Sequence, residues 1–193
     1  MGWKGAFPER PVLCGPLLGS TLIDSRGDGQ TPSVSLSKYR TFCAEAEFCV
    51  VLRHTLQPLR NDQSYTKEQV WEAVDRVELC IEFCGARQFE STEKLHYVSD
   101  ALCSAAVVRG PCIGTKEDIG DPSSLAQHKV ELFCNDHKVS EGNGKNNPGD
   151  SPLSSLTILA NEVCGERGIP LEAGSVVICG HCCQAQLEGQ PSP

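Results

Sequence analysis

The chain has 193 residues and a formal net charge of −8 at pH 7, from 17 basic and 25 acidic residues. A net negative field opposes contact with a phosphate backbone, which disfavours a nucleic-acid-binding function. No apolar run approaches the roughly 20 residues that a membrane span needs, and the first residues lack the apolar core of a signal peptide. We therefore expect a cytoplasmic protein with no nucleic-acid partner and no membrane partner.

Cysteine is abundant, with 12 residues. This share is below that of short disulfide scaffolds. Several of these cysteines stand inside apolar runs, as at 48–50 and 79–81, where a free cysteine behaves as a small hydrophobic residue. Since no export signal is evident, we expect reduced thiols that pack in the core.

The first half of the chain is predicted to contain extended segments, two strands and one helix. Residues 1–41 are rich in Gly, Pro and Ser, which predicts short extended pieces joined by turns. Residues 42–53 alternate with period 2, so Glu45 and Glu47 share one face of a strand. The capping-box spacing of Thr66 and Gln69, followed by apolar residues at helical spacing, predicts a helix over 66–78. A second strand follows at 79–84, with Glu82 opposite its apolar residues.

The second half is predicted to contain short strands and one more helix. An apolar stretch within 99–114 is closed at 109–111, and a strand at 130–134 runs into a hairpin turn at 135–138. A mobile polar loop is expected at 140–150, before a helix that begins after Ser151 and ends at Gly165. The last strand is expected at 175–179 and a disordered tail at 185–193. This order of elements predicts an α+β or a mixed-sheet α/β fold, as a single domain over 1–184.

Three glutamates form the main candidate site. Side chains two residues apart on one strand face lie about 6.5–7 Å apart, so Glu45 and Glu47 can converge on one ion with Glu82 from the next strand. Like charges about 4 Å apart cost about 4 kcal/mol at an effective dielectric of about 20. A hard divalent cation, Mg²⁺ or Mn²⁺, removes that conflict. From spacing alone, the alternative is a strand whose glutamates face solvent.

Two further motifs could carry chemistry. Residues 179–183 have the sequence Cys-Gly-His-Cys-Cys. A redox dithiol needs the N-terminus of a following helix, and for a zinc site the sequence has no second ligand pair at typical spacing. The alternative is that these cysteines pack at the end of a strand. Lys4, beside Trp3, can hold a substrate carboxylate or enolate near an anionic site. The alternative for Lys4 is a solvated charge.

Several short segments follow one another in the order found in one family. They are Gly-Trp-Lys at 2–4, Gly-Pro-Leu at 15–17, Glu-Ala-Glu-Phe at 45–48, the 65–75 helix before Ile-Glu-Phe at 81–83, Ser-Asp-Ala-Leu at 99–102, Ser-Pro-Leu at 151–153, Leu-Ala-Asn at 159–161 and Leu-Glu-Ala-Gly-Ser at 171–175. Together they resemble the 2-keto-4-pentenoate hydratase / 4-oxalocrotonate decarboxylase group of the fumarylacetoacetate hydrolase superfamily. The resemblance extends from residue 2 to about 184.

The resemblance implies a fold, a metal and a reaction. The fold is a mixed β-roll with flanking helices, and Glu45, Glu47 and Glu82 match the ligands of a divalent metal, Mg²⁺ or Mn²⁺. In that family a small unsaturated 2-oxo or 2-hydroxy-dienoic acid chelates the ion, which stabilises an enolate before water adds or CO₂ leaves. Lys4 matches an active-site lysine and Asp100 a positioning aspartate. We expect a lyase, hydratase ahead of decarboxylase, that forms a homo-oligomer.

The chain also departs from that family. An Asp-Ser-Arg segment after the third glutamate is replaced by residues 84–86, with only Arg87 kept, and a Thr-Gly-Ser/Thr strand end is replaced by residues 179–181. We also expect a chain shortened at both ends. Two alternatives stay open: a catalytically inactive paralogue that keeps the fold for oligomer assembly, and a thiol redox or zinc module.

Overall fold

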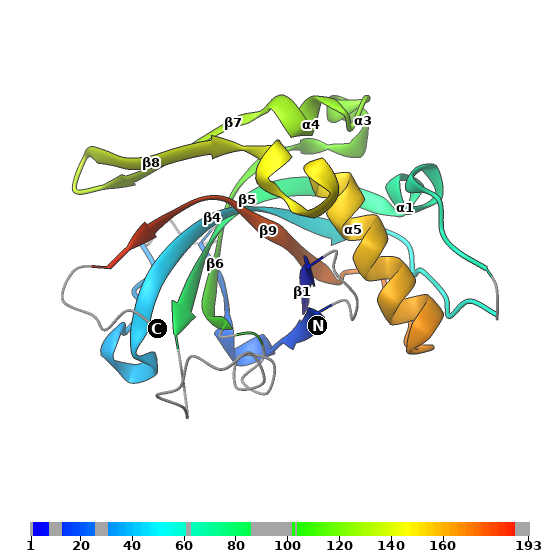
Figure 1. Cartoon of the computed structure of the whole chain (residues 1–193), viewed down its shortest axis with the longest axis horizontal. Coiled ribbons are helices and arrows are strands. Elements are labelled where there is room, and N and C mark those ends of the chain that lie inside the picture. The colour runs from blue at the N-terminus through cyan, green and yellow to red at the C-terminus, as the bar shows by residue number, and fades with distance from the viewer. Residues whose placement is uncertain are drawn as a thin grey trace.

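The computed structural model describes residues 2–7, 13–25, 31–60, 63–85, 102 and 104–187. Within these residues, Figure 1 shows a curled sheet with one long helix on its flank and a separate hairpin above it. The strands are β1 (Gly2–Phe7), β2 (Leu13–Leu17), β3 (Leu22–Asp24), β4 (Thr41–Leu52), β5 (Val74–Gly85), β6 (Ser104–Thr115), β7 (Lys129–Cys134), β8 (His137–Asn143) and β9 (Val176–Gln186). The α-helices are α1 (Lys67–Glu72), α3 (Lys116–Ile119), α4 (Ser124–Gln127) and α5 (Pro152–Ala160), which continues as a π-helix, η6 (Asn161–Glu166); short 3-10 turns are η1 (Gly19–Thr21), η2 (Ser37–Tyr39), η4 (Gly144–Asn146) and η5 (Pro148–Asp150).

The main sheet is mixed. Its strand order is β2-β1-β9-β4-β5-β6-β3, in which β1 pairs with β9 and β3 pairs with β6 in parallel, and the other neighbours are antiparallel. The predicted α+β class with a mixed β-roll is confirmed. The extended pieces and turns expected in 1–41 are also found, as β1, β2 and β3.

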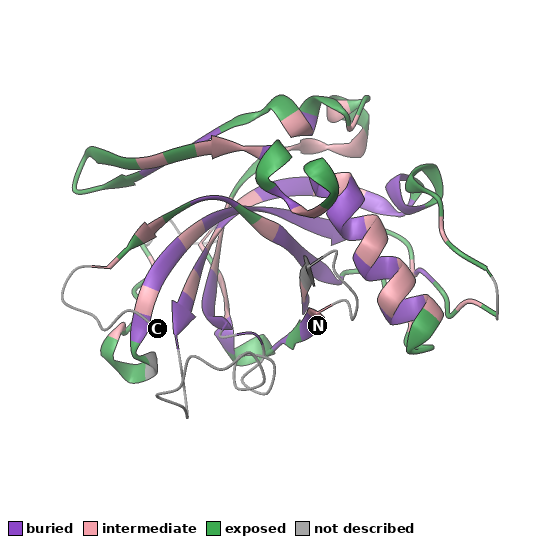
Figure 2. Ribbon diagram, viewed as in Figure 1, coloured by how far each residue is buried: buried purple, intermediate pink, exposed green. Residues whose placement is uncertain are grey.

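The two faces of the sheet have different roles. Strand alternation sends Phe48 and Val50 of β4 into the larger apolar cluster, where they pack with Leu156 and Leu159 of α5. Val51 belongs to a second, smaller cluster on the opposite face. Figure 2 shows the buried stripe of α5 turned toward the sheet. The inner face of the curl therefore has the smaller apolar core, and the buried Glu47, Glu78 and Glu82 lie on the same face.

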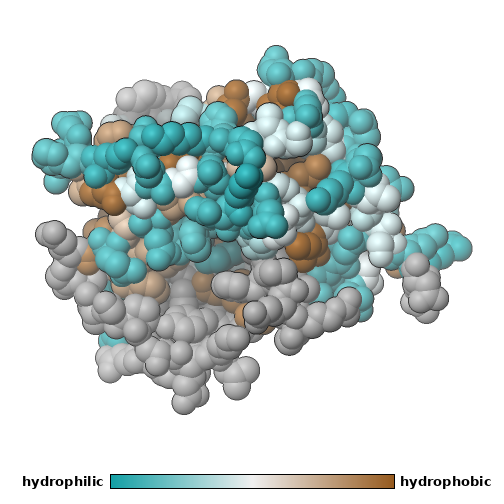
Figure 3. All heavy atoms as spheres, turned by 45° about the horizontal axis from the view of Figure 1, so that its top comes forward, coloured by the Kyte–Doolittle hydropathy of each residue, from teal (hydrophilic) through white to brown (hydrophobic). Residues whose placement is uncertain are grey.

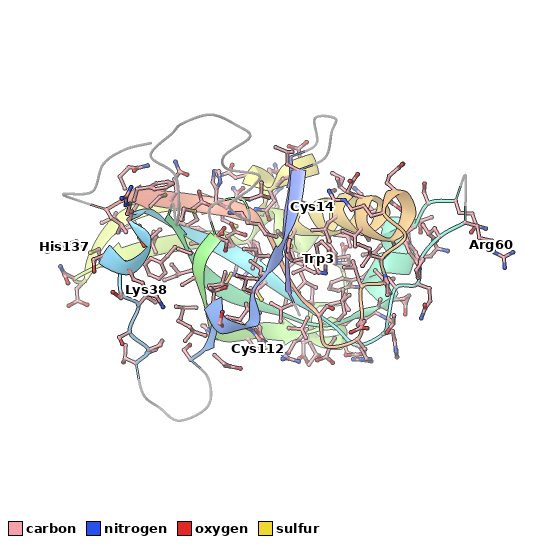
Figure 4. All side chains as sticks on the ribbon, turned by 90° about the horizontal axis from the view of Figure 1, so that it is seen from below. Trp3, Cys14, Lys38, Arg60, Cys112 and His137 are labelled. Atoms are coloured by element: carbon pink, nitrogen blue, oxygen red, sulfur yellow. The ribbon has the colours of Figure 1, made fainter. Side chains whose placement is uncertain are left out.

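Strand β1 follows the same alternation. Trp3 is 6% exposed and belongs to the larger cluster, and Figure 4 labels it and Cys14 along the β1–β2 pair on the side of α5. The next residue, Lys4, therefore projects from the other face of β1. This places a lysine against the inner face of the curl.

The helix predicted over 66–78 is shorter than expected. Its capping box is confirmed, since the Thr66 hydroxyl accepts from the Gln69 amide and the Gln69 side chain accepts from the Thr66 amide. The helix ends at Glu72, however, and β5 begins at Val74. Residues 77–83 also alternate with period 2, and pairing with β4 as far as Leu52 outweighs the helical spacing of the same valines.

The β7–β8 hairpin is partly as predicted. Asn135 and Asp136 both have positive φ, of 48° and 64°, as a two-residue hairpin turn requires. Its outer surface in Figure 3 is mostly hydrophilic, and Lys138 donates to Glu131 and Glu141 there. The mobile loop expected at 140–150 is wrong, because β8 extends to Asn143 and η4 and η5 follow it.

Two strands are longer than predicted. β6 continues through Gly110 and Pro111 to Thr115, and β9 continues to Gln186. Residues 185 and 186, expected in the tail, are therefore part of the sheet, whereas residues 188–193 lie outside the described part of the chain. Among the described helices, none has the length and apolar character needed to cross a membrane.

Candidate metal centre

The three predicted glutamates come from two paired strands on the inner face of the curl. The register of β4 and β5 sets Glu45 directly opposite Glu82, and Glu47 opposite Cys80. Glu47 is 1% exposed and Glu82 is fully buried, while the Glu45 side chain keeps 17% exposure. Two carboxylates are thus deep in the fold and the third stands at the rim.

A tight group of potential ligand atoms involves a cysteine. Carboxylate oxygens of Glu45 and Glu82 and the Sγ of Cys84 all lie within 4.8 Å of one another. Glu47 is not a member of this group, although its charge acts on the same site. The structure therefore brings carboxylate oxygens of Glu45 and Glu82 together, whereas Glu47 lies outside this group and is more deeply buried than Glu45.

Lys4 supplies the positive charge of the site. Its Nζ donates to Glu82 Oε1 at 2.7 Å and to the carbonyl of Leu102 at 3.0 Å. Leu102 has a φ of 56°, an uncommon backbone conformation for leucine. Burial acts to lower the pKa of Lys4, but the negative charges led by Glu82 overcome it and raise that pKa. In the metal-free site, the neighbouring carboxylates therefore favour the protonated ammonium form of Lys4.

Glu47 is held from the other side by β9. Its Oε2 accepts a hydrogen bond of 2.8 Å from the backbone N–H of Gly180. Burial raises the pKa of Glu47 well above its usual range, and the charges of Glu82 and Glu45 raise it further, against the opposing effects of Lys4 and the Gly180 N–H. The described surroundings of Glu47 thus do not supply enough positive charge to stabilise its ionised form.

Gly180 stands at an irregularity in β9 that only glycine fits. The pairing of β4 with β9 shifts register on both sides of Glu47, and Gly180 has a φ of 95°. A Cβ there would lie 2.9 Å from Pro148 Cδ. Asn147 donates to the carbonyls of Gly180, at 2.6 Å, and His181, at 3.2 Å. Asn147, in the 140–150 segment, thus holds the irregularity in β9 that points the Gly180 N–H toward Glu47.

The donor set fits a divalent cation. Glu47 Oε1 and Glu82 Oε2 are buried oxygens with no hydrogen-bond partner among the described residues, and burying such atoms unpaired is costly. Among the described residues, the three carboxylates face one ammonium, that of Lys4. A doubly charged ion with oxygen ligands would provide a partner for carboxylate oxygens of this kind and balance negative charge in the site.

Sequence reasoning placed Lys4, Glu45, Glu47 and Glu82 in one site, and these side chains do lie in one region of the fold. Asp100 lies outside the described residues. The sequence did not identify Cys84 as part of the site, although the i, i+2 rule applied to Glu45 and Glu47 also puts Cys84 on the face of Glu82. The sequence identified His181 within the 179–183 motif and the 179–181 replacement, but not as a neighbour of Glu45, whose Oε1 lies 4.0 Å from its Nδ1. That proximity depends on the β4–β9 register.

The Cys-Gly-His-Cys-Cys segment lies within β9. Cys179 and Cys182 are both buried, and burial raises the pKa of Cys179 well above its usual range and that of Cys182 to about 12. A reactive dithiol needs the opposite shift, which a helix N-terminus provides, and here the chain continues as a strand. These contacts favour the packing interpretation of this segment.

No protein-family model matches the chain, and no curated protein matches it. Solved structures do. The 4-oxalocrotonate decarboxylase from Pseudomonas putida G7, complexed with magnesium and adipate, is 23% identical with a TM-score of 0.78, over 96% of this chain and 69% of that one. The same enzyme complexed with calcium and acetate is also 23% identical, with a TM-score of 0.77 over the same shares. A fumarylacetoacetate hydrolase family protein from yeast is 13% identical with a TM-score of 0.61, over 96% of this chain and 81% of that one. The chain therefore has the fold of the fumarylacetoacetate hydrolase superfamily.

Proposed function

We propose that this protein is a divalent-metal-dependent lyase that acts on small unsaturated 2-oxo or 2-hydroxy-dienoic acids. The observation that carries the proposal is that buried carboxylate oxygens of Glu47 and Glu82 have no hydrogen-bond partner within the described part of the chain. Glu45 and Lys4 lie beside them. The fold, shared with a decarboxylase complexed with magnesium, supports the same conclusion. We also propose the inferred homo-oligomer and the cytoplasmic location, on the sequence arguments alone.

Glu45, Glu47 and Glu82 would hold the cation, Mg²⁺ or Mn²⁺. When bound, such an ion supplies Lewis-acid stabilisation of negative charge that develops on a 2-oxo oxygen. The residues prepare this position in advance, because Lys4 fixes Glu82 through Oε1 and Gly180 fixes Glu47 through Oε2. Each carboxylate thus keeps its second oxygen free for the ion.

Lys4 would act through its charge. As an ammonium in contact with Glu82 it offsets part of the negative charge of the site and adds positive potential for an anionic substrate. It holds its proton and does not abstract one, so we assign it a positioning role. Asp100, which the resemblance matches to a positioning aspartate, remains the second candidate.

The floor of the site is apolar. The smaller apolar cluster includes Cys49, Cys80 and Val107, and Cys80 stands opposite Glu47 in the strand register. An apolar floor lowers the local dielectric, which strengthens the attraction between an anionic substrate and the cations of the site. It also suits the carbon chain of an unsaturated acid.

Decarboxylation and hydration share the same first requirement, a stabilised 2-oxo oxygen, and differ in the bond that is then broken or formed. Two of the similar structures are of a 4-oxalocrotonate decarboxylase, so CO₂ release from an unsaturated 2-oxo diacid is tested first. Water addition, favoured from the sequence, is tested second. Product analysis separates the two, since only the first reaction loses a carbon.

Metal binding is the test of the site itself. Chelator-treated protein should melt at a higher temperature when Mg²⁺ or Mn²⁺ is added, by the equivalent of about 2.7 kcal/mol at 100 times the dissociation constant. Glu47→Gln should abolish the shift, and Glu131→Gln, on the exposed hairpin, should leave it intact. No shift in the wild type would contradict the proposal and favour an inactive paralogue. A shift without turnover of any 2-oxo acid would favour a metal-binding paralogue that has lost the reaction.

A further inference from the structure

We propose that Cys84 is a sulfur ligand in this metal centre, so that the site prefers a thiophilic divalent cation of the Zn²⁺ or Co²⁺ class to Mg²⁺. The inference rests on the proposed function as far as the existence of the metal site is concerned. It changes which ion is the natural occupant.

The position of Cys84 carries the first part of the argument. Cys84 follows Glu82 by two residues on β5, so both side chains project from the same face. Its Sγ and oxygens of Glu45 and Glu82 are mutually within 4.8 Å. In tetrahedral coordination, an oxygen about 2.0 Å from a zinc ion and a sulfur about 2.3 Å from it lie about 3.5 Å apart. Side-chain shifts of about an ångström are therefore enough to bring all three atoms onto one ion.

A second observation points to a cation at the same place. Glu82 is fully buried, and its Oε2 has no hydrogen-bond partner among the residues that the structure describes. Lys4 occupies only Oε1. Glu82, whose carboxylate belongs to the group that contains the thiol, therefore has one oxygen without a partner among the described residues.

The chemistry of the ligands then selects the ion. Mg²⁺ prefers oxygen ligands and keeps several waters, whereas thiolate sulfur selects zinc and other thiophilic ions. On binding, the S–H bond of Cys84 breaks, an S–metal bond forms, and the proton passes to solvent. No oxidant or reductant is involved. A thiolate added to the carboxylates of this site would thus favour Zn²⁺ or Co²⁺ over Mg²⁺.

The neighbouring strand offers a matched control. Cys43 of β4 stands directly opposite Cys84 in the strand register, and the two residues are similarly buried, at 2% and 6% exposure. Cys43 does not belong to the group of three ligand atoms. Cys43→Ser and Cys84→Ser therefore make the same chemical change in the same layer of the sheet, and only the second removes a ligand.

Cobalt reports sulfur ligation directly. The metal-free full chain is titrated with CoCl₂ and its near-ultraviolet absorption recorded. We expect a sulfur-to-cobalt charge-transfer band in the wild type and in Cys43→Ser, and no such band in Cys84→Ser. Loss of an outer-shell partner costs about tenfold or more in metal affinity, so loss of this direct ligand should weaken Co²⁺ and Zn²⁺ binding by at least that factor. Mg²⁺ affinity should stay within about twofold, since Mg²⁺ does not draw on the sulfur.

The outcomes separate this inference from the proposed function. Mg²⁺ binding with no charge-transfer band in the wild type, or a band that survives in Cys84→Ser, would overturn sulfur ligation and leave the carboxylate site standing. No binding of any of the three ions would overturn both proposals. Cys84→Ala is a second variant in case the serine disturbs packing, and unchanged circular dichroism qualifies either variant for the comparison.

Discussion

Two buried glutamates on the same face of β5, four residues apart, have opposite surroundings. Glu78 is fully buried and accepts from Arg76 Nε at 2.7 Å and from Arg109 through Nε and Nη2, both at 3.0 Å. Both of its oxygens are occupied by guanidinium donors in charge-assisted bonds. Glu82 is equally buried but is bound by a single ammonium, Lys4, and shares its surroundings with Glu45 and Glu47.

The difference separates a structural ion pair from a binding site. At Glu78 guanidinium groups donate to both carboxylate oxygens, so the hydrogen-bonding capacity of that carboxylate is met within the described protein. At Glu82 one oxygen has no hydrogen-bond partner, and carboxylates outnumber cations, among the described residues. Glu78 and Glu82 are thus the same residue type at two inward positions of β5. The protein itself supplies the hydrogen-bond donors for Glu78, whereas we propose that a cation supplies the missing partner for Glu82.

The largest expected effect comes from breaking the complete pair. Arg109→Ala should cost about 3–5 kcal/mol of unfolding free energy, because it leaves the buried Glu78 charge with one partner fewer. Urea-induced unfolding measures the loss. Arg167→Ala, which removes a half-exposed pair with Glu162, is the control and should cost about 1 kcal/mol or less. Equal losses in the two variants would contradict the structural role of the Glu78 network.

Lys4→Met should cost a similar amount in metal-free protein, about 3 kcal/mol, since Glu82 is then buried without a cation. The two variants differ in rescue. Saturating divalent cation should restore about 2.7 kcal/mol to Lys4→Met at 100 times the dissociation constant and should restore nothing specific to Arg109→Ala. Melting curves with chelator and with metal decide this. Rescue of both variants alike would mean that the ion acts elsewhere.

Local sequence patterns predicted the parts of the fold that depend on local chemistry. The period-2 pattern placed Glu45 and Glu47 on one strand face, and the turn residues Asn135 and Asp136 gave the hairpin. The extent of α1 and the course of 140–150 depended on distant partners instead. Asn146 donates to the carbonyl of Cys182 at 2.6 Å, a contact that no local pattern specifies.

The candidate site shows the same limit. Glu82 was assigned to the site by family resemblance and by its apolar flanks, and only the strand register sets it opposite Glu45. Cys84 shares the face of Glu82 by its spacing, but nothing local in the sequence indicates that Glu45 lies beside it. The Gly180 N–H on Glu47 arises from an irregularity in β9 held by Asn147, and irregular pairing leaves no periodic signal.

Gly180→Ala tests how strongly the irregularity in β9 affects metal binding at the carboxylate site. A positive φ costs a non-glycine residue about 1–2 kcal/mol, and here the Cβ would also lie 2.9 Å from Pro148. Gly174→Ala is the matched control, because Gly174 also has a positive φ, of 80°, but has no atom within 4 Å of its built Cβ. Both variants should lose stability, and Gly180→Ala should in addition weaken divalent-metal binding. Equal metal affinity in the two variants would contradict a role for Gly180 in aiming Glu47.

The smallest expected effect is a pH dependence with a definite sign. In metal-free protein the pKa of Glu47 is raised above its ordinary value of 4.5, chiefly by burial and then by Glu82 and Glu45. The folded state therefore holds a proton that the unfolded state has already released. This group's contribution to stability is thus greatest below about pH 4.5 and falls as pH rises toward the folded-state pKa, by up to about 1.4 kcal/mol per pH unit.

Glu47→Gln should remove that decline and make the metal-free protein more stable than the wild type near neutral pH. Glu131→Gln is the control of opposite sign, because hydrogen bonds from Lys129 and Lys138 hold the pKa of Glu131 below its usual range. Urea unfolding at several pH values, with chelator present, measures both. Added divalent cation should reverse the wild-type trend, since the ion binds the ionised carboxylate and its affinity grows as the proton leaves. A contrary result would be a wild-type stability that does not change with pH in chelator and is unchanged by metal. It would mean that the protein itself balances the charge of Glu47, as it does for Glu78, and that the contrast between Glu78 and Glu82 does not mark a metal site.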